Sequence, residues 1–422
     1  MNKLRACCRV AALLPLLWAA GPLGARTWTV DATGPNKRIS VAVASAADGD
    51  TIRVLAGTYR EGTITIDRRL ALVGVGRPLI DGGEQGDVVV INAPGTTLRG
   101  FRITGTLVSN INDNAGIKVT KADSVSIIDN IVEHCFFAIH VASSRNTVIE
   151  RNQVLGDPKA PETRMGNGIH LWHCAGAEIL DNISQDHRDG IYFEFVTDSH
   201  IRRNKSLRNS RYGLHFMFSH RDTYSDNTFS GNGAGVAVMY SKEVDMRRNK
   251  FIRNRGASSY GLLLKEINDA VIDSNQFNDN TTAILLDGCN RLEVIGNTFQ
   301  GNGWALRLFS NSMTCHFEAN SFTGNTFDLS TNGDPKYNSF SGNYWDRYRG
   351  YDLDRNGTGD VPFRPLSLFA LVNERMPYAV VLSRSLLTQL LDQAERLIPS
   401  MTPEGLEDAK PLMKSPHGSI GL

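Results

Sequence analysis

The sequence predicts an all-β fold, a right-handed parallel β-helix with a short C-terminal helical segment. Three observations carry this prediction. Asparagine recurs at a fixed place about every 22 residues, a four-residue apolar strand pattern recurs with the same period, and both patterns stop near residue 345. A repeat this short cannot bury its own apolar face, so neighbouring repeats must stack to close a common core.

The asparagine repeat runs through segments such as DNIV, RNKS and GNYW. Most of its steps are 22 or 23 residues, and the longer steps of 30 and 26 residues fit inserted loops at 156–164 and 256–260. Asparagine suits a corner with left-handed backbone geometry, and stacked asparagines can hydrogen-bond from coil to coil. A β-propeller is the alternative, but its blades need about 40 residues. The repeated residues are Asn130, Asn152, Asn182, Asn204, Asn227, Asn249, Asn275, Asn297, Asn320 and Asn343.

The strand repeat comprises nine segments that begin with GIKV at residue 116 and end with ALRL at residue 305. The second and fourth residues of each segment are apolar, which predicts a short strand with one buried face. A third apolar column lies three residues before each asparagine and is also expected to point inward. Alternating strands over residues 47–76 extend the pattern backwards, and this stretch looks like the opening coils of pectin-lyase-like and carbohydrate-binding β-helix families.

The segments outside the repeat predict the rest of the organisation. Residues 1–25 combine a basic start, an apolar run and small residues, which is typical of a secretory signal. We therefore expect a mature chain outside the cytoplasm. The β-helix is expected over residues 26–345. A turn-rich linker (346–365), an amphipathic helical segment (366–400) and a mobile, polar tail (401–422) are expected to follow.

Composition excludes some classes of protein. The net charge is +1, so nothing in it favours nucleic acid as a partner. No stretch after the signal is apolar for 18 residues, so the mature chain is not expected to be transmembrane. The cysteines of the mature chain are scattered, and one disulfide or none is compatible with them. They are Cys135, Cys174, Cys289 and Cys315.

The strand pattern fixes the side-chain directions in RYGLHFMFSH (211–220). Leu214 and Phe216 form the inward pair, so His215 and Met217 are expected to point outward. Neighbouring coils lie about 4.8 Å apart. Met217 and Met239 should therefore stack on one exposed face, with His215 beside the first of them.

Other histidines gather near this face. His220 lies just past the strand, and His170 and His173 lie two coils away. Thioether sulfur and imidazole together suit Cu(I), which is a soft ion. The alternative is that the 156–164 loop or the C-terminal helix simply covers these side chains, and the pattern leaves both open. His140 belongs to the same column and is expected to be structural.

Two further constellations compete with the copper hypothesis. The QDHRDG turn places Asp186, His187, Arg188 and Asp189 together, as an acid–base site of a uronate lyase or C5-epimerase would require. A solvated corner is the favoured alternative. The DLDRNGTGD stretch (352–360) resembles the front of a calcium loop but has Phe363 where the twelfth-position glutamate would stand. Its candidate ligands are Asp352, Asp354, Asn356 and Asp360.

The C-terminal segment carries an apolar stripe at helical spacing. A stripe of this kind must pack on the β-helix, on a partner protein, or on both, because such a helix is not stable alone in water. We expect it to be a docking surface. The stripe consists of Leu386, Leu387, Leu390, Leu391, Ala394 and Leu397.

Several longer motifs together resemble the NosD family. They include RYGLHFMFS (211–219), YGLLLKEIND (260–269) and NYWDRYRGYDLDRNGTGDVP (343–362). The resemblance covers most of the chain from about 110 to 415. It implies a periplasmic β-helix protein without enzymatic activity that assists copper insertion into nitrous oxide reductase. It also implies docking on the permease subunit of an ABC transporter and work with a membrane-anchored copper chaperone.

Overall fold

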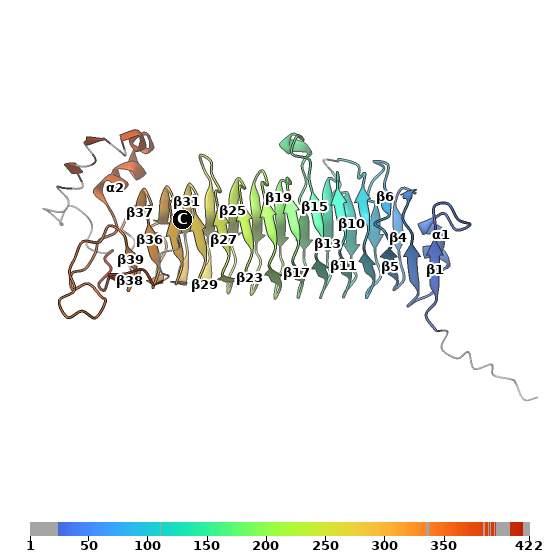
Figure 1. The fold of residues 1–422 in the computed structure, drawn as a ribbon, viewed down its shortest axis with the longest axis horizontal. Coiled ribbons are helices and arrows are strands. Elements are labelled where there is room, and N and C mark those ends of the chain that lie inside the picture. Colours follow the sequence, from blue (N-terminus) through green and yellow to red (C-terminus); the bar gives the residue numbers. More distant parts are fainter. Residues whose placement is uncertain are drawn as a thin grey trace, which may run out of the picture.

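The molecule is a long rod of stacked coils, in which three parallel sheets run from end to end (Figure 1). The computed structural model describes residues 24–109, 111–334, 337–382 and 406–416, together with Ser385, Leu386, Thr388, Leu390, Leu391 and Gln393. The parallel β-helix predicted from the repeats is confirmed. The predicted signal lies outside the described residues, apart from its last two positions.

Each coil passes through sheets A, B and C in turn, and strands of neighbouring coils pair in parallel. Sheet A consists of β1 (Thr27–Val30), β2 (Thr51–Val54), β5 (Ala71–Gly74), β8 (Thr97–Arg99), β11 (Ser126–Ile128), β14 (Val148–Glu150), β17 (Glu178–Leu180), β20 (His200–Arg202), β23 (Thr223–Ser225), β26 (Asp245–Arg247), β29 (Asn268–Asp273), β32 (Asn290–Ile295), β35 (His316–Glu318) and β38 (Ser339–Ser341). Sheet B consists of β3 (Thr58–Arg60), β6 (Leu79–Asp81), β9 (Arg102–Thr104), β12 (Ile131–Glu133), β15 (Gln153–Leu155), β18 (Ile183–Gln185), β21 (Lys205–Leu207), β24 (Thr228–Ser230), β27 (Lys250–Ile252), β30 (Gln276–Asn278), β33 (Thr298–Gln300), β36 (Ser321–Thr323) and β39 (Tyr344–Trp345). Sheet C consists of β4 (Ile64–Ile66), β7 (Val89–Ile91), β10 (Ala115–Thr120), β13 (Phe137–Ala142), β16 (Ile169–Trp172), β19 (Asp189–Glu194), β22 (Tyr212–Met217), β25 (Ala234–Met239), β28 (Tyr260–Lys265), β31 (Thr282–Asp287), β34 (Trp304–Leu308) and β37 (Phe327–Ser330).

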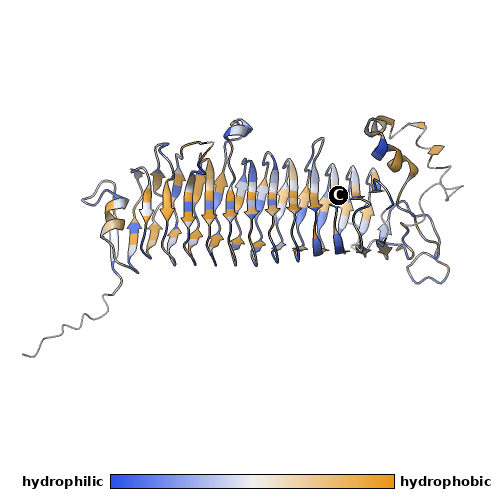
Figure 2. Cartoon of the chain, turned by 180° about the vertical axis from the view of Figure 1, so that it is seen from behind, coloured by the Kyte–Doolittle hydropathy of each residue, from blue (hydrophilic) through white to orange (hydrophobic). Residues whose placement is uncertain are grey.

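The core fills the inside of the rod with the apolar columns expected from the sequence. Leu214 and Phe216 of β22 are fully buried, and so is Met246 of β26. Figure 2 shows hydrophobic and hydrophilic residues intermixed along the strands of the rod. On sheet B the inward residues form a stack of aromatic rings from Phe229 to Trp345, with centroids 4.1–5.5 Å apart between successive coils. Burial of these columns supplies the main driving force for stacking.

The corner between sheets A and B is held by the predicted asparagine ladder. The Oδ1 atom of Asn227, for example, accepts hydrogen bonds from the backbone N–H and the Nδ2 atom of Asn204, at 2.9 and 3.0 Å. A second ladder, which the repeat analysis missed, holds the corner between sheets B and C. It appears five residues after the first ladder and consists of Asn209, Asn232, Asn254, Asn280, Asn302 and Asn325.

Short elements cover the two ends of the rod. Helix α1 (Ile39–Ser45) closes the N-terminal end and buries Ile39. Helix α2 (Leu368–Arg375) lies at the other end and buries Phe369 and Ala370. Glu374 fixes this helix to sheet C, since its carboxylate pairs with Arg307 at 2.6 Å. Two 3-10 turns are also present, η1 (Glu162–Arg164) and η2 (Pro377–Leu382).

Part of the expected mobile tail is instead a structural cap. Residues 406–416 return to the end of the rod, where Leu406 and Asp408 are buried. Asp408 Oδ2 accepts hydrogen bonds from Asn343 and from Trp345 Nε1, so its carboxylate takes the next place in the first asparagine ladder. The mobile tail was predicted from the polar composition of this segment. Its polar side chains instead provide hydrogen-bond acceptors for donors of the last coil.

Two chemical features bear on the class of protein. The thiols of Cys135, Cys174, Cys289 and Cys315 are free. Within the part of the chain that the structure describes, no helix is both long and apolar enough to span a membrane.

Candidate functional site

Sheet C presents a column of rings on its outer face. The register aligns His140, His170, Tyr192 and His215 in successive coils, with ring centroids 4.7–4.9 Å apart. All three histidines are nevertheless buried, at 8%, 8% and 6% exposure. His170 and His215 thus occupy the expected outward column, but they are covered rather than exposed. Each ring is covered by its neighbours in the column and by Phe137 or Tyr212 beside it.

The buried imidazoles in this column are poor bases. Burial lowers the pKa of His140. Burial, together with the nearby His140 and Arg188, holds the pKa of His170 well below its ordinary value. Both rings are therefore neutral near pH 7 and keep a lone pair for a metal. The nearest acidic group to His215 is Asp189, whose Oδ2 lies 3.8 Å from Nδ1.

The two methionines lie side by side on the same face. Met217 of β22 and Met239 of β25 are in direct register, and both side chains are half-buried. The expected adjacency is thus correct. In the same column Glu194 lies one coil before Met217, and Lys265 lies one coil after Met239.

A stripe of exposed rings, which the sequence analysis did not identify, borders the methionines. His173, Phe195, Phe218 and Tyr240 occupy the same corner position in four successive coils, and their rings stack at 4.6, 5.3 and 5.1 Å. We call these four residues the aromatic stripe. The phenylalanine and tyrosine rings are each about 40% exposed. The signal in the sequence is an aromatic or imidazole residue directly after the outward column in each of these coils.

His220 lies beyond the stripe, three residues after Met217. Its backbone bridges to Thr197 of the preceding coil, and its Nδ1 atom has no hydrogen-bond partner. Burial, with the charges of Lys242 and Arg221, lowers the pKa of this imidazole. The six predicted metal residues therefore divide into two groups. Met217, Met239 and His220 lie next to the aromatic stripe in the chain, His173 is its first ring, and we call these four residues the methionine patch; His170 and His215 belong to the buried column.

The donor atoms of the patch restrict the kind of metal that fits. Among the described residues, no group of three or more histidine, cysteine, aspartate or glutamate side chains could hold a metal ion. A hard or four-coordinate ion therefore finds no complete ligand set there. Two thioethers with an imidazole nearby suit Cu(I), because this ion is soft.

The acidic corner does not form the predicted acid–base cluster. Asp186 is engaged by Arg208, with Oδ2 and Nη2 3.0 Å apart. His187 is buried inside the corner, and burial lowers its pKa to about 4. Asp189 is buried on sheet C beside His215. Nor is the corner simply solvated, because two of these side chains are inaccessible to solvent.

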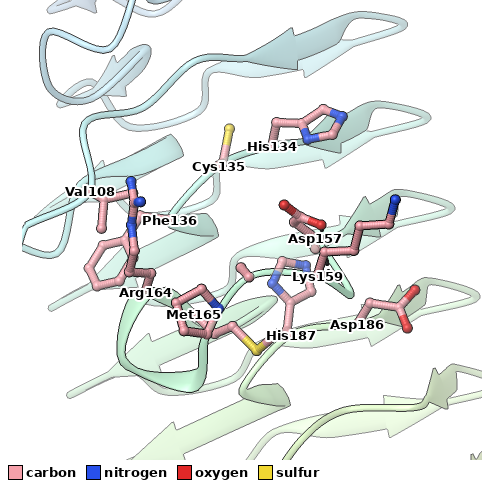
Figure 3. A pocket seen from close by; sticks show the side chains of 14 residues that line it. Val108, His134, Cys135, Phe136, Asp157, Lys159, Arg164, Met165, Asp186 and His187 are labelled. Carbon is pink, nitrogen blue, oxygen red and sulfur yellow. Dashed lines mark hydrogen bonds between the residues drawn. The ribbon is translucent and has the colours of Figure 1, made fainter.

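A cavity of about 360 Å³ opens at the corner between sheets B and C, under the loop at 156–166 (Figure 3). Its walls carry the thiol of Cys135, the thioether of Met165 and the imidazole of His187. Burial raises the pKa of Cys135 to about 12, so the thiol stays protonated. The cavity lies at the opposite end of the sheet C strands from the methionine patch.

The predicted calcium loop closes on itself. Asp352 accepts hydrogen bonds from the backbone N–H groups of Asn356 and Gly357, and Asp360 accepts one from Leu353. Asp354 holds the amide of Asn356. These bonds occupy the oxygens that a calcium ion would need, so the geometry gives calcium no support.

The described leucines of the C-terminal stripe differ in their exposure to solvent. Leu386 is 71% exposed and Leu390 is 54% exposed, whereas Leu391 packs partly buried against the core. Leu387, Ala394 and Leu397 lie outside the described residues. Other exposed apolar side chains continue the surface next to α2, namely Met376, Tyr378, Val381 and Leu382.

Comparison with known proteins places the fold in a defined class. The structure resembles the catalytic unit of an alpha-1,3-glucanase from Streptomyces thermodiastaticus, with a TM-score of 0.62, 15% identity and coverage of 78% of this chain and 70% of that one. It also resembles a mannuronan C-5 epimerase A-module from Azotobacter vinelandii, with a TM-score of 0.55, 15% identity and coverage of 72% and 94%. At such identities the likeness shows the parallel β-helix fold alone.

The sequence comparisons show which family within this class the chain resembles. Residues 157–350 match the model of the family described as "Periplasmic copper-binding protein (NosD)". Two relatives are named "Probable ABC transporter binding protein NosD". The one from Pseudomonas aeruginosa is 28% identical over 390 residues, which cover 88% of this chain and 90% of the relative. The one from Stutzerimonas stutzeri is 26% identical over 385 residues, with coverage of 86% and 87%. The chain is therefore similar to the NosD family over most of its length, and that family is described as periplasmic.

Proposed function

We propose that this protein binds Cu(I) at the methionine patch and passes it on during maturation of nitrous oxide reductase, while docked on an ABC transporter. The main observation in support of this proposal is the position of the two methionines. Met217 and Met239 stand side by side, half-buried, on a face otherwise made of aromatic rings and histidines. The description of the family as copper-binding supports the choice of metal.

The shape of the patch suits transfer rather than storage. The two methionine side chains are half-buried, the imidazole of His173 belongs to the aromatic stripe, and His220 lies two residues past Phe218. A soft ion held by so few ligands can be released to a partner, whereas a closed four-ligand site would hold it tightly. A membrane-anchored copper chaperone would be the donor and nitrous oxide reductase the acceptor.

The docking part of the proposal rests on the C-terminal surface. Leu386 and Leu390 expose apolar side chains after α2 in the chain, as do Tyr378 and Val381 shortly before them. An exposed apolar cluster of this kind is typical of a protein–protein contact. We assign it to the permease subunit of the transporter, because the relatives are named transporter binding proteins.

The experiment is a Cu(I) titration of the mature protein under anaerobic conditions, against a chromophoric competing chelator. Met217→Leu with Met239→Leu preserves side-chain volume and should cost little stability. We expect this variant to lose Cu(I) binding at the patch and to support a reductase with less than its full copper content. Met313→Leu is the matched control, because Met313 is exposed in a distant coil.

Unchanged Cu(I) affinity and full reductase activity in the double variant would place the copper site elsewhere. The rival function is that of a polysaccharide-active enzyme. It would be supported by release of unsaturated or epimerised uronate from a polysaccharide by the wild-type protein, with loss of that activity in Asp186→Asn with His187→Gln. We assign no enzymatic activity to this corner, because its carboxylates do not converge. Asp186 pairs with Arg208, whereas Asp189 lies beside His215.

A further inference from the structure

The cavity under the loop at 156–166 is a feature that the repeat itself does not provide. The loop is the longest insertion between the repeated asparagines, where a step of 30 residues replaces the usual 22 or 23. Inserted loops on a rigid scaffold often carry binding sites. Gly156 and Gly166 let its two ends approach the neighbouring coils, because a Cβ atom at these positions would lie 1.9 Å from the backbone oxygen of Asp186 and 2.1 Å from that of Phe136. The loop is therefore held closely between the coils.

Apolar side chains form much of the cavity wall. Val108 and Phe136 come from earlier coils, and Pro161 and Met165 come from the loop itself. The volume of about 360 Å³ lies within the range of about 300–1,000 Å³ that is typical of small-molecule pockets. Such pockets are mostly apolar and contain a few polar groups that orient the ligand. A ligand of this cavity should therefore have a compact apolar body.

Arg164 provides the polar group on the apolar side. Figure 3 draws its side chain on the same side of the cavity as Phe136 and Val108. Among the described residues, no acidic side chain forms an ion pair with Arg164. A guanidinium group presents N–H donors in a planar fork that matches a carboxylate. The lining thus combines an apolar surface with one group suited to an organic acid.

The other charged groups of the lining balance one another. Asp157, Lys159 and Asp186 lie on the opposite side of the cavity from Arg164 (Figure 3). Asp186 pairs with Arg208 at 3.0 Å, and Asp157 accepts the backbone N–H of Lys159 at 2.9 Å. Two carboxylates therefore face two cations on that side. Arg164 is left as the cation without an acidic counterpart.

The sulfur and imidazole groups of the lining are poorly placed for a metal. Burial raises the pKa of Cys135 to about 12, and a protonated thiol is a weak ligand. Nε2 of His187 is buried within the corner. An organic anion therefore fits this cavity better than a metal ion does.

We propose that the cavity binds a small organic carboxylate with an apolar body. The carboxylate pairs with Arg164, and the body packs on Val108, Phe136 and Met165. This site lies at the opposite end of the sheet C strands from the methionine patch, so it does not depend on the proposed copper binding.

The test uses two probes that share one apolar body and differ in charge. Isothermal titration calorimetry of the mature protein compares 1-naphthoate with 1-naphthalenemethanol. We expect 1-naphthoate to bind with a stoichiometry of one and Arg164→Gln to weaken this binding by about 10–100-fold, the usual range for a lost charge-assisted hydrogen bond. The affinity for the alcohol should be weaker from the start and should not change in this variant.

Two further variants complete the test. Ala160→Trp places a large side chain in the cavity wall and should abolish binding of both probes. Arg255→Gln is the matched control, because Arg255 lies next to the other inserted loop (256–260) and pairs with Asp279 at 3.6 Å. It should bind 1-naphthoate like the wild type. Thermal melts check that the variants fold, and Arg164 is exposed, so its substitution leaves the core intact.

Two results would overturn the inference. The first is the absence of 1-naphthoate binding to the wild-type protein, and the second is equal affinity of the wild type and Arg164→Gln for 1-naphthoate. Neither result would affect copper binding at the methionine patch, because Cu(I) titrations of Arg164→Gln and Ala160→Trp should match the wild type. Failure of the copper proposal would likewise leave the 1-naphthoate measurements unchanged.

Discussion

Five corner residues separate what the backbone requires from what the surface does. The corner between sheets C and A needs one residue with positive φ in each coil, and Lys121, Ser143 and Glu266 meet this need with φ of 51°, 54° and 56°. Phe218 and Tyr240 do the same with φ of 50° and 55°. The backbone therefore does not demand a ring. Exposed rings at this corner reflect a role of the surface, since bulky residues are uncommon in left-handed geometry.

A buried carboxyl group near the C-terminal end predicts a dependence of stability on pH. Burial raises the pKa of Asp328 from 3.8 to about 6. Because the folded pKa is the higher one, the carboxyl contributes stability below about pH 4, and this contribution is lost as the pH rises through about 6. The difference of about two units corresponds to about 3 kcal/mol. Asp328→Asn should therefore be more stable than the wild type at pH 7.

Urea denaturation of both proteins at pH 4 and pH 7 would measure this effect. The free energies of unfolding should agree near pH 4 and separate in favour of Asp328→Asn at pH 7. Asp279→Asn serves as the control, because its carboxylate is on the surface. Parallel pH profiles for Asp328→Asn and the wild type would show that the carboxyl is not held protonated.

At the scale of elements, the two asparagine ladders set the register of the coils. Each ladder side chain is buried and bonds to the coils before and after it. The first ladder ends on Asp408, which comes from the returning C-terminal segment. Without that carboxylate the last strand of sheet B would expose unpaired donors at the end of the rod. Open sheet ends of this kind are prone to pairing with other chains.

Asp408→Ala should therefore loosen the last coil. The substitution leaves the backbone N–H and the amide of Asn343 and the indole N–H of Trp345 without their acceptor. We expect a loss of about 2–4 kcal/mol, in line with the cost of unpaired buried donors. Hydrogen exchange should show faster exchange in β36 and β39 and unchanged protection in the central coils, because coils of a solenoid interact mainly with their neighbours.

Asp408→Asn is the matched control for this cap. An asparagine oxygen can accept the same bonds that each ladder asparagine accepts, so we expect a smaller loss than with alanine. Equal stability of the alanine variant and the wild type would mean that residues 406–416 do not contribute to the end of the rod.

At the scale of the whole molecule, the rod separates the methionine patch from the proposed docking surface. The patch lies on sheet C near the middle of the stack, and α2 lies at one end (Figure 1). A rigid rod can therefore hold a metal-bearing face at a distance from a membrane partner. We therefore expect substitutions in the docking surface to leave copper binding intact, and substitutions in the methionine patch to leave docking intact.

Leu386→Asp with Leu390→Asp should abolish docking without unfolding the protein. Both side chains are exposed, so the charges disturb little of the protein's own packing, but burial of each leucine at a contact is worth about 1.5–3 kcal/mol. Co-purification with the transporter should be lost, while the melting temperature and Cu(I) titration stay unchanged. Val41→Asp is the control, because Val41 is 56% exposed on α1 at the opposite end of the rod. If the double variant still co-purified stoichiometrically with the transporter, Leu386 and Leu390 would not be part of the docking surface.

The sequence alone determined the architecture of this protein. A period of about 22 residues in asparagine and in paired apolar positions specifies coils, their corners and their inward faces, because each coil satisfies the same local rules. The side-by-side placement of Met217 and Met239 followed from that register. The family resemblance also used motifs that the repeat does not explain, such as NYWDRYRGYDLDRNGTGDVP (343–362).

The tertiary structure alone decided which outward side chains are accessible. His170 and His215 point outward, yet they are buried, because rings stacked along the column cover one another at 4.7–4.9 Å. The aromatic stripe and the Asp408 cap depend in the same way on contacts between coils and between distant segments. Periodicity gives the direction of a side chain, but exposure depends on the neighbours above, below and beside it, and these come from other turns of the chain.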